Sequence, residues 1–490
     1  MSRITDEEWE SLLLRGNCIE HKNQQRKRDI VVNMLRLLIP TLVRQIAVEY
    51  GLKQDDFQCQ ILPFGSYGLG ANLIDSDIDV VFLAPSEVRR SDFFRIFPSI
   101  LKEQATVQDV ETVENTTVPI IKCTIDRIPV DISFVRLKIA SVPENINILD
   151  NKHLSELDDS CIVSIDGVRV TQFILEQIRN EDLPTFRLCL QAIRWWAKQR
   201  HIYNKPIGYL NGGCWALLLL KTYQMYKNEI SVQGLLTYFF ELWTNWPWPS
   251  PVILTDGIPD FDGRTIDYKS LVEFEDALMA IVTPCYRVSN ASPNVSVYTL
   301  NVVKKELARA RAILHSHFDS PRDMTSKLFK KYNIIKDHSN FLVIVVSCDT
   351  YTTYETWLGK MHNAIPRLLE LMEQVPEIKD IRPYTEPITQ TINFNTRAEK
   401  ICLQTLQPVV RPEIDHRRSM LEPGMLYRTC HILGIDVKLD KDGEQTVVDV
   451  SKQVSMFKRI VDSRRNRKEN DMVVNVVSKK RKDLVTLLNL

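Results

Sequence analysis

The segment FGSYGLGANLIDSDIDVVFLAP (residues 64–85) joins a turn of small residues to a strand that carries two aspartates. Side chains alternate faces along a strand, so Asp77 and Asp79 project to the same side, about 7 Å apart along the backbone. Two carboxylates this close repel one another unless they face water or share a cation. Gly65 and Ser66 are small enough for backbone N–H groups to approach a phosphate closely. The segment therefore indicates either a metal and phosphate site or an exposed strand end.

A third acidic residue extends this pattern. Asp131 lies in the run RIPVDISFV, where Val130, Ile132 and Phe134 share one face, so its carboxylate points to the other. A carboxylate between such apolar neighbours requires a partner. Three carboxylates can hold two Mg²⁺ or Mn²⁺ ions, one for an attacking hydroxyl and one for a triphosphate. A Gly-Ser turn, a D-x-D strand and a later strand-borne aspartate resemble the DNA polymerase β-like nucleotidyltransferases, which favours the metal-site interpretation.

The composition limits the class of protein. Formal net charge is zero, so a polyanion site must be a local concentration of lysine and arginine. Ten cysteines are scattered without a C-x-x-C pair, which favours a reduced compartment over a disulfide framework or a zinc module. The acidic N-terminus MSRITDEEWESLLLRG lacks an apolar signal region, and runs such as FLVIVV are too short to cross a bilayer. We therefore expect a soluble intracellular protein.

Two zones of different character open the chain. Residues 1–160 are predicted to be α+β, with helical spacing interrupted by Pro40, then strands, then a hairpin around Asp126 and Arg127. Residues 161–328 are predicted to form a helical domain, whose clearest helix is PTFRLCLQAIRWWAKQRHIY. Together these zones predict an α+β domain over residues 1–160 followed by a helical domain over residues 161–328.

The remaining residues predict a second α/β domain and a tail. Residues 329–462 alternate strands and helices, among them the strand NFLVIVVSC and a long amphipathic helix over 354–372, which suggests a ferredoxin-like sandwich. Residues 463–490 hold two basic clusters, RRNRK and KKRK, in a polar context that predicts disorder. The clusters resemble a bipartite nuclear-import signal, and the same charges could bind RNA phosphates; a solvated end is the alternative.

The helix that begins near Pro184 carries a polar face. Arg187, Gln191, Arg194 and Lys198 fall at i, i+4, i+7 and i+11, which places three positive charges on one side. Such a face is either solvated, as on most amphipathic helices, or available to neutralise triphosphate oxygens. The carboxylates upstream favour the second interpretation.

Longer motifs follow the opening segment. GVRVTQFIL, FRLCLQAIRWWAKQRHIYNKPIGYLNGGCWALL, WPWPSPVIL and MAIVTPCYRVSNASPNVSVYT occur in this order before residue 300. They resemble successive motifs of the eukaryotic nuclear poly(A) polymerase family, and residues 329–462 resemble its C-terminal RNA-recognition-like domain. The resemblance implies a polymerase β-like palm, a helical central domain and a ferredoxin-like RNA-binding domain. It also implies template-independent addition of AMP from ATP to RNA 3′ ends in mRNA 3′-end processing.

Site residues carry over by position. The resemblance implies that Asp77, Asp79 and Asp131 bind two Mg²⁺ or Mn²⁺ ions, with Asp131 nearest the attacking 3′ hydroxyl. The Ser66 hydroxyl would bond the triphosphate. With the polar helix face included, the nucleotide-binding set would be Phe64, Gly65, Ser66, Arg194, Lys198, Tyr203, Gly212 and Gly213.

The sequence departs from the family pattern at several positions. Arg194 stands where a triphosphate-binding lysine is usual, Gly68 where a basic residue is usual, and Leu73 where threonine is common. Asp166 replaces an asparagine, and Gly213 replaces a valine that packs on the base. An acid near adenine could still accept a hydrogen bond from its exocyclic amine, so base selectivity depends on these positions.

Three functional interpretations stay open. Poly(A) polymerase leads, and another terminal ribonucleotidyltransferase, adding UMP or a CCA end, would differ in nucleotide preference. An inactive RNA-binding scaffold is the third, although it would have no use for three intact metal ligands. The resemblance further implies a nuclear monomer that does not bind membranes and whose partners are the RNA 3′ end, ATP and cleavage and polyadenylation factors.

Overall fold

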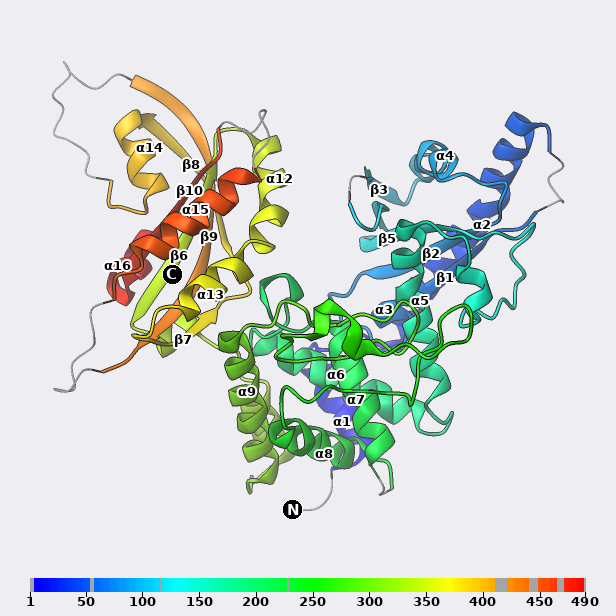
Figure 1. Ribbon diagram of the computed structural model, residues 1–490, viewed down its shortest axis with the longest axis horizontal. Coiled ribbons are helices and arrows are strands. Elements are labelled where there is room, and N and C mark those ends of the chain that lie inside the picture. Colours follow the sequence, from blue (N-terminus) through cyan, green and yellow to red (C-terminus); the bar gives the residue numbers. More distant parts are fainter. Residues whose placement is uncertain are drawn as a thin grey trace. The chain divides into compact units, whose positions relative to one another are not determined.

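The structure is a computed structural model that describes residues 4–52, 57–114, 116–226, 229–409, 421–439, 448–464 and 471–488 (Figure 1). The chain forms two compact units. The first unit comprises Met1–Trp196, Gly212–Ala291 and Ala310–Leu328, and the second comprises Ala197–Asn211, Ser292–Arg309 and Phe329–Leu490.

A five-stranded sheet organises the first unit. Its order is β1-β2-β5-β4-β3, with β2 and β5 parallel and the other neighbours antiparallel. The strands are β1 (Gln60–Phe64), β2 (Ile78–Ala84), β3 (Val107–Val113), β4 (Ile120–Ile125) and β5 (Ile128–Arg136). β4 and β5 form the predicted hairpin: Asp126 and Arg127 both have positive φ, 49° and 66°, as the two-residue turns that match strand twist require.

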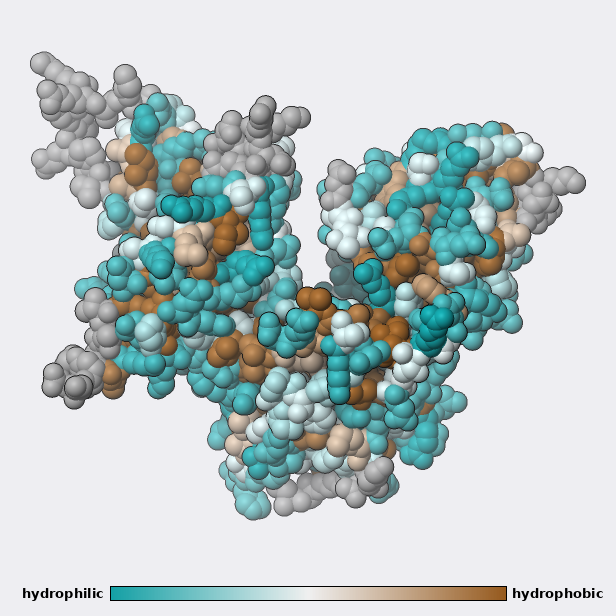
Figure 2. All heavy atoms as spheres, in the orientation of Figure 1, coloured by the Kyte–Doolittle hydropathy of each residue, from teal (hydrophilic) through white to brown (hydrophobic). Residues whose placement is uncertain are grey.

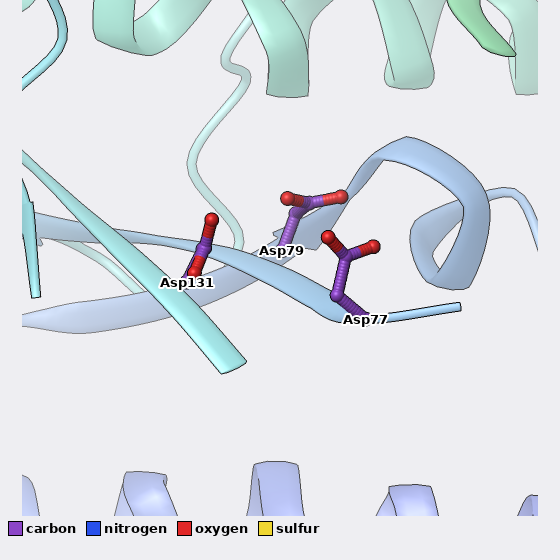
Figure 3. A group of neighbouring side chains, drawn as sticks. All are labelled: Asp77, Asp79 and Asp131. Atoms are coloured by element: carbon purple, nitrogen blue, oxygen red, sulfur yellow. The ribbon is translucent and has the colours of Figure 1, made fainter. Parts of the chain in front are cut away.

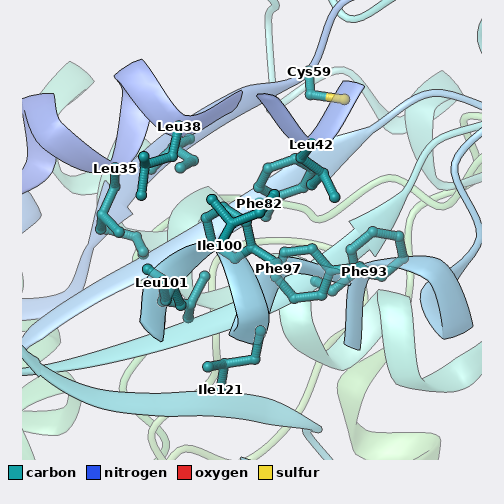
Figure 4. Packing of buried hydrophobic residues seen from close by; sticks show 14 of the residues in the cluster. Leu35, Leu38, Leu42, Cys59, Phe82, Phe93, Phe97, Ile100, Leu101 and Ile121 are labelled. Atoms are coloured by element: carbon teal, nitrogen blue, oxygen red, sulfur yellow. The ribbon is translucent and has the colours of Figure 1, made fainter. Parts of the chain in front are cut away.

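Helices cover both faces of this sheet. On one face, α2 (Lys22–Tyr50) and α4 (Arg90–Lys102) bury a cluster that includes Phe82 of β2 and is drawn in Figure 4. On the other, α5 (Asp159–Glu176) packs against Val81 and Leu83. Burial on both faces explains why β2 is a continuous apolar run rather than an alternating one.

α2 runs through Pro40 as a single helix, and it is long and apolar enough to cross a membrane by length and composition alone. The core helix of a globular protein meets the same criterion, and Val31, Leu35 and Leu42 of α2 are buried in the sheet cluster. The sequence predicted helical spacing here but an interruption at Pro40, whereas α2 continues through this residue.

The rest of the first unit is largely helical. Trp196 is fully buried, with its ring edge-on to those of Trp215 at 5.6 Å and Phe240 at 4.8 Å. Asp6 of α1 accepts hydrogen bonds from the Thr185 hydroxyl (2.6 Å) and the Val232 amide (2.8 Å), which fixes α1 to this helical part. Its other helices are α1 (Asp6–Arg15), α3 (Gly65–Gly68), α6 (Leu183–Gln199), whose end from Ala197 onward belongs to the second unit, α7 (Gly212–Met225), α8 (Val232–Asn245) and α10 (Pro321–Leu328), with 3-10 turns at Asn151–Leu154, Tyr268–Ser270 and Val272–Phe274.

The second unit contains the ferredoxin-like sandwich. Strands β6, β7, β9 and β10 follow the order β10-β6-β9-β7 with every neighbour antiparallel. β8 pairs with the first part of β9, Leu421 to Cys430, whereas β7 pairs with its last part. The strands are β6 (Asn340–Cys348), β7 (Ile378–Pro383), β8 (Ile388–Thr396), β9 (Leu421–Val437) and β10 (Val473–Lys480). The helices are α9 (Val297–His315), which continues into the first unit, α11 (Ile334–Asp337), α12 (Tyr351–His362), α13 (Ile365–Glu373), α14 (Arg397–Gln404), α15 (Ser451–Ser463) and α16 (Arg481–Leu488), with a 3-10 turn at Lys205–Ile207.

Two sequence expectations for this unit are wrong. The helix predicted over residues 354–372 is two helices, α12 and α13, because Pro366 begins a new helix in its first turn. The tail predicted to be disordered contains β10, which pairs with β6 over its whole length, and α16, whose Leu484 and Leu488 are buried. The valine-rich run VVNVV, with its high strand propensity, supplies the outer strand next to β6, a signal that the surrounding charges obscured.

Of the two basic clusters of the tail, KKRK alone lies wholly within the described residues. Most of RRNRK lies outside the described residues, whereas KKRK spans the end of β10 and the start of α16. Arg481 donates to the carbonyl oxygen of His338 from Nε at 2.9 Å and from Nη2 at 2.8 Å.

Hydrophilic side chains dominate the face drawn in Figure 2, as expected when the apolar residues are used in the two sheet cores.

If the tail is part of the fold, its apolar contacts stabilise the second unit. Replacing Leu484, which is fully buried, with alanine should lower the free energy of unfolding by about 2–4 kcal/mol. Replacing the exposed Lys482 with alanine should change it by less than about 0.5 kcal/mol. Urea denaturation of both variants measures their free energies of unfolding. Equal values would contradict a folded tail and support the disorder expected from the sequence.

Candidate active site

Three aspartates meet at one end of the first sheet (Figure 3). Asp79 on β2 is the register partner of Asp131 on the parallel strand β5, and Asp77 lies just before β2. Each offers a carboxylate oxygen within 4.8 Å of the other two. Asp79 and Asp131 project to the face covered by α5, opposite the face of Val130, Ile132 and Phe134, as the sequence pattern predicted.

Burial and mutual repulsion disfavour three negative charges here. Burial, followed by the charges of Asp77 and Asp131, raises the pKa of Asp79 to about 7, against a smaller lowering effect of Arg194. Burial also raises the pKa of Asp131, although Lys122 on the neighbouring strand β4 acts to lower it. A divalent cation between the three groups would remove the repulsion, and Mg²⁺ and Mn²⁺ prefer such carboxylate oxygens. The donor set therefore fits a divalent metal site.

A sharp turn where β1 meets α3 brings the main chain of Gly65 against the Asp79 carboxylate. Gly65 has φ +62°, and a Cβ atom there would lie 2.6 Å from Oδ2 of Asp79. Only glycine permits this approach. The Gly65 amide donates to the Thr171 hydroxyl on α5 at 3.1 Å, so α5 fixes the turn.

The neighbouring predicted residues have distinct surroundings. Phe64 is packed against Gly167 of α5, where a Cβ atom would lie 2.6 Å from the ring, and it borders the cluster beneath α5. Ser66 is half-buried on α3. Gly68, noted above as a departure from the family pattern, has a local cause: a Cβ atom there would lie 2.9 Å from the Pro63 carbonyl oxygen. The turn thus selects small residues for steric reasons.

The polar face of α6 is directed at the loop between α3 and β2. Arg187 Nε donates to the carbonyl of Leu69 at 2.8 Å, and Gln191 Nε2 donates to that of Asn72 at 3.0 Å. Arg194 Nη1 donates to the carbonyl of Ala71 at 2.6 Å. Arg194 is 6% exposed, and its charge acts on the nearby Asp79. In this structure the face holds the loop that leads to the aspartates.

The other predicted nucleotide-binding residues lie on different parts of the chain. Lys198 and Tyr203 belong to the second unit, where the lysine amino nitrogen is 5.6 Å from the centre of the tyrosine ring. Gly212 and Gly213 begin α7 in the first unit, and α7 packs against α3. Asp166 lies on α5, where its charge acts to raise the pKa of Cys285, which burial already raises to about 12.

Sequence reasoning missed two supporting residues. Thr171 fixes the Gly65 turn, and the buried Arg28 donates to the carbonyl of Asp77 at 3.4 Å. A threonine inside a helix carries no distinctive signal. An arginine among the buried positions of α2 could have been recognised, because a buried guanidinium requires several acceptors.

The pKa of Asp79 predicts a pH-dependent effect on stability. Because the pKa in the native state, about 7, exceeds the ordinary value near 4, the native protein retains a proton that the unfolded chain loses between these values. Stability from this group therefore falls as pH rises from about 4 to 7. In EDTA, Asp79→Asn should be more stable than the parent protein by roughly 1–3 kcal/mol at pH 8, and the difference should shrink towards pH 5. A pH-independent difference in urea denaturation would contradict this assignment.

The turn at Gly65 predicts a matched pair of variants. Gly65→Ala forces a methyl group against Asp79 and should weaken Mn²⁺ binding by roughly 10–100-fold. Gly51→Ala is the control, because Gly51 has φ +66° and a Cβ atom there would meet no atom within 4 Å, so the substitution imposes the same backbone strain alone. Calorimetric titration with Mn²⁺ compares them, and similar affinities for both variants would argue against the close approach.

Three family models match consecutive parts of the chain. The Poly(A) polymerase nucleotidyltransferase domain matches residues 4–178, the Poly(A) polymerase central domain matches 185–331, and the Poly(A) polymerase predicted RNA binding domain matches 334–489. The three matched domains follow the same order as the predicted α+β domain, helical domain and ferredoxin-like sandwich.

Individual poly(A) polymerases are also similar to this chain over most of its length. The Poly(A) polymerase of Dictyostelium discoideum is 29% identical over 405 residues, which cover 81% of this chain and 49% of that protein. The Poly(A) polymerase PAPalpha of Candida albicans is 28% identical over 460 residues, covering 90% and 80%. The chain thus spans about half the length of the first relative. Among solved structures, a cytoplasmic RNA terminal U-transferase aligns with a TM-score of 0.46 and 17% identity, over 66% of this chain and 98% of that chain.

Proposed function

The chain belongs to the poly(A) polymerase family of nucleotidyltransferases, and we propose that it adds AMP from ATP to RNA 3′ ends without a template. The convergence of Asp77, Asp79 and Asp131 at one sheet end carries this proposal. A scaffold would gain nothing from clustered carboxylates that raise the pKa of Asp79 and Asp131, whereas a metal-dependent transferase requires such a cluster.

The aspartates supply the chemistry of the site. Asp77, Asp79 and Asp131 would hold two Mg²⁺ or Mn²⁺ ions, and Asp131 would lie nearest the attacking hydroxyl. Such ions, when bound, activate the hydroxyl and neutralise charge on the triphosphate. The 3′ oxygen of the RNA forms a bond to the α-phosphorus as the bond to the β-phosphate oxygen breaks, and pyrophosphate leaves. Because no covalent bond to the protein forms, the protein contributes position and electrostatics.

The turn and its neighbours would bind the nucleotide. The exposed part of Ser66 suits a hydrogen bond to the triphosphate, and Gly65 lets the main chain lie against the metal ligands. Arg194 adds a buried positive charge close to Asp79. The other proposed nucleotide-binding residues are Phe64, Lys198, Tyr203, Gly212 and Gly213.

We further propose the domain limits and cellular role implied by the family. The catalytic domain would comprise residues 1–160, the central domain 161–328 and the RNA-binding sandwich 329–462, to which β10 and α16 now add the residues that follow. The protein would act as a nuclear monomer in mRNA 3′-end processing, with cleavage and polyadenylation factors as partners. Both relatives named above are eukaryotic, which supports this role.

Primer extension tests the reaction and the base choice together. A short labelled RNA is incubated with Mg²⁺ and each NTP separately, beside an Asp131→Ala variant. We expect long tails with ATP alone, and at least a roughly 1,000-fold loss of rate in the variant, because one metal ligand is removed. Extension with UTP or CTP would instead indicate a different terminal transferase and direct attention to Asp166 and Gly213. RNA binding without extension in Mg²⁺ or Mn²⁺ would contradict the proposal and support the scaffold.

A further inference from the structure

The three aspartates are not held in the same way. Asp79 and Asp131 lie within paired strands, so the ladder of β2 and β5 fixes their backbones. Asp77 precedes β2, which begins at Ile78, and its side chain is the most exposed of the three. Repulsion from two neighbouring carboxylates would drive this side chain towards solvent. Its position therefore requires a second restraint.

Arg28 supplies a contact at this point. It lies on α2 and is only 2% exposed, and its Nη1 donates to the main-chain carbonyl of Asp77 at 3.4 Å. The guanidinium reaches across 49 residues of sequence to the residue where the loop becomes β2. This hydrogen bond ties the last loop residue before the strand to the long helix behind the sheet.

Glu20 holds Arg28 in place. Its two carboxylate oxygens accept from Arg28 Nε at 2.8 Å and from Nη2 at 3.0 Å, a two-pronged ion pair whose side chains are 2% and 9% exposed. Asn72 Nδ2 also donates to Glu20, at 3.0 Å. The planar guanidinium can make these bonds in a fixed geometry, which a lysine ammonium cannot reproduce. Glu20 therefore fixes the orientation of the guanidinium that donates to Asp77.

We propose that Arg28 is a positioning residue for the metal site, oriented by Glu20, and that it keeps the Asp77 carboxylate within reach of a cation shared with Asp79 and Asp131. This inference rests on the metal site proposed above. The same loop is held at Leu69, Ala71 and Asn72 by side chains of α6, so Arg28 completes the restraint at its far end.

A purely structural ion pair is the competing explanation. A buried Arg–Glu pair could anchor the start of α2 to the loop with no effect on Asp77, and its loss would then lower stability alone. Metal affinity measured on folded protein separates the two roles, because it reports the Asp77 position without requiring turnover.

The test compares Arg28→Lys, which keeps the charge and removes the planar fork, with Arg95→Lys. Arg95 on α4 also pairs with a carboxylate, Glu49, at 2.7 Å, but its side chain is 54% exposed. Free Mn²⁺ is counted by electron paramagnetic resonance during titration of each protein, at a pH near 8, and urea denaturation confirms that each is folded. We expect Arg28→Lys to weaken Mn²⁺ binding by roughly 10–100-fold, and Arg95→Lys to leave it unchanged.

The other outcomes are equally informative. If folded Arg28→Lys binds Mn²⁺ as tightly as the parent protein, the positioning role is refuted and the pair is structural. Glu20→Gln provides the same comparison should Arg28→Lys not fold, since it leaves the guanidinium in place but weakens its orientation. If the parent protein itself binds no Mn²⁺, or Asp77→Asn binds it equally well, the proposed metal site fails, whatever Arg28 does.

Discussion

The parallel pairing of β2 with β5 is the constraint on which the candidate site depends. It places Asp79 directly beside Asp131, on the sheet face that α5 covers. The apolar residues on the reverse side of both strands belong to the cluster under α2 and α4, so the register cannot slip without burying the carboxylates. The free energy of core packing thereby holds two like charges together, and an electrostatically unfavourable pair becomes a stable feature of the fold.

Polar contacts extend this order to the loop between α3 and β2. Buried carbonyl groups need donors, and the α6 side chains Arg187, Gln191 and Arg194 supply them. The helical part of the first unit is thus joined to the sheet by hydrogen bonds as well as by apolar contacts. A charged helix face can be occupied by the protein's own main chain, and α6 is an example. The loop is therefore held in one conformation before any ligand binds.

Much of this architecture could be predicted from the sequence, because it rests on short-range patterns. The alternation around Asp131 gave its face correctly, the hairpin at Asp126 and Arg127 follows from a two-residue connection, and the sandwich follows from its order of strands and helices. The chain's place in the poly(A) polymerase family was recognised from motifs in order.

The features that the sequence did not predict depend on partners that are remote in the sequence. β10 is stable because β6 lies beside it, more than 120 residues away in sequence, and no local property of a basic tail indicates that partner. The direction of the α6 side chains and the contact of Arg28 with Asp77 likewise depend on segments remote in sequence. Pro366 is a different case, since proline favours the first turn of a helix and its position is local information that predicts the start of α13.

The most direct test of the proposed metal site is anomalous X-ray diffraction from crystals of the protein grown with Mn²⁺ and a non-hydrolysable ATP analogue. A two-metal site predicts two manganese peaks, each bonded to carboxylate oxygens of Asp77, Asp79 or Asp131, with the triphosphate bonded to one of them. Manganese bound elsewhere, or an analogue bound without manganese at these aspartates, would contradict it.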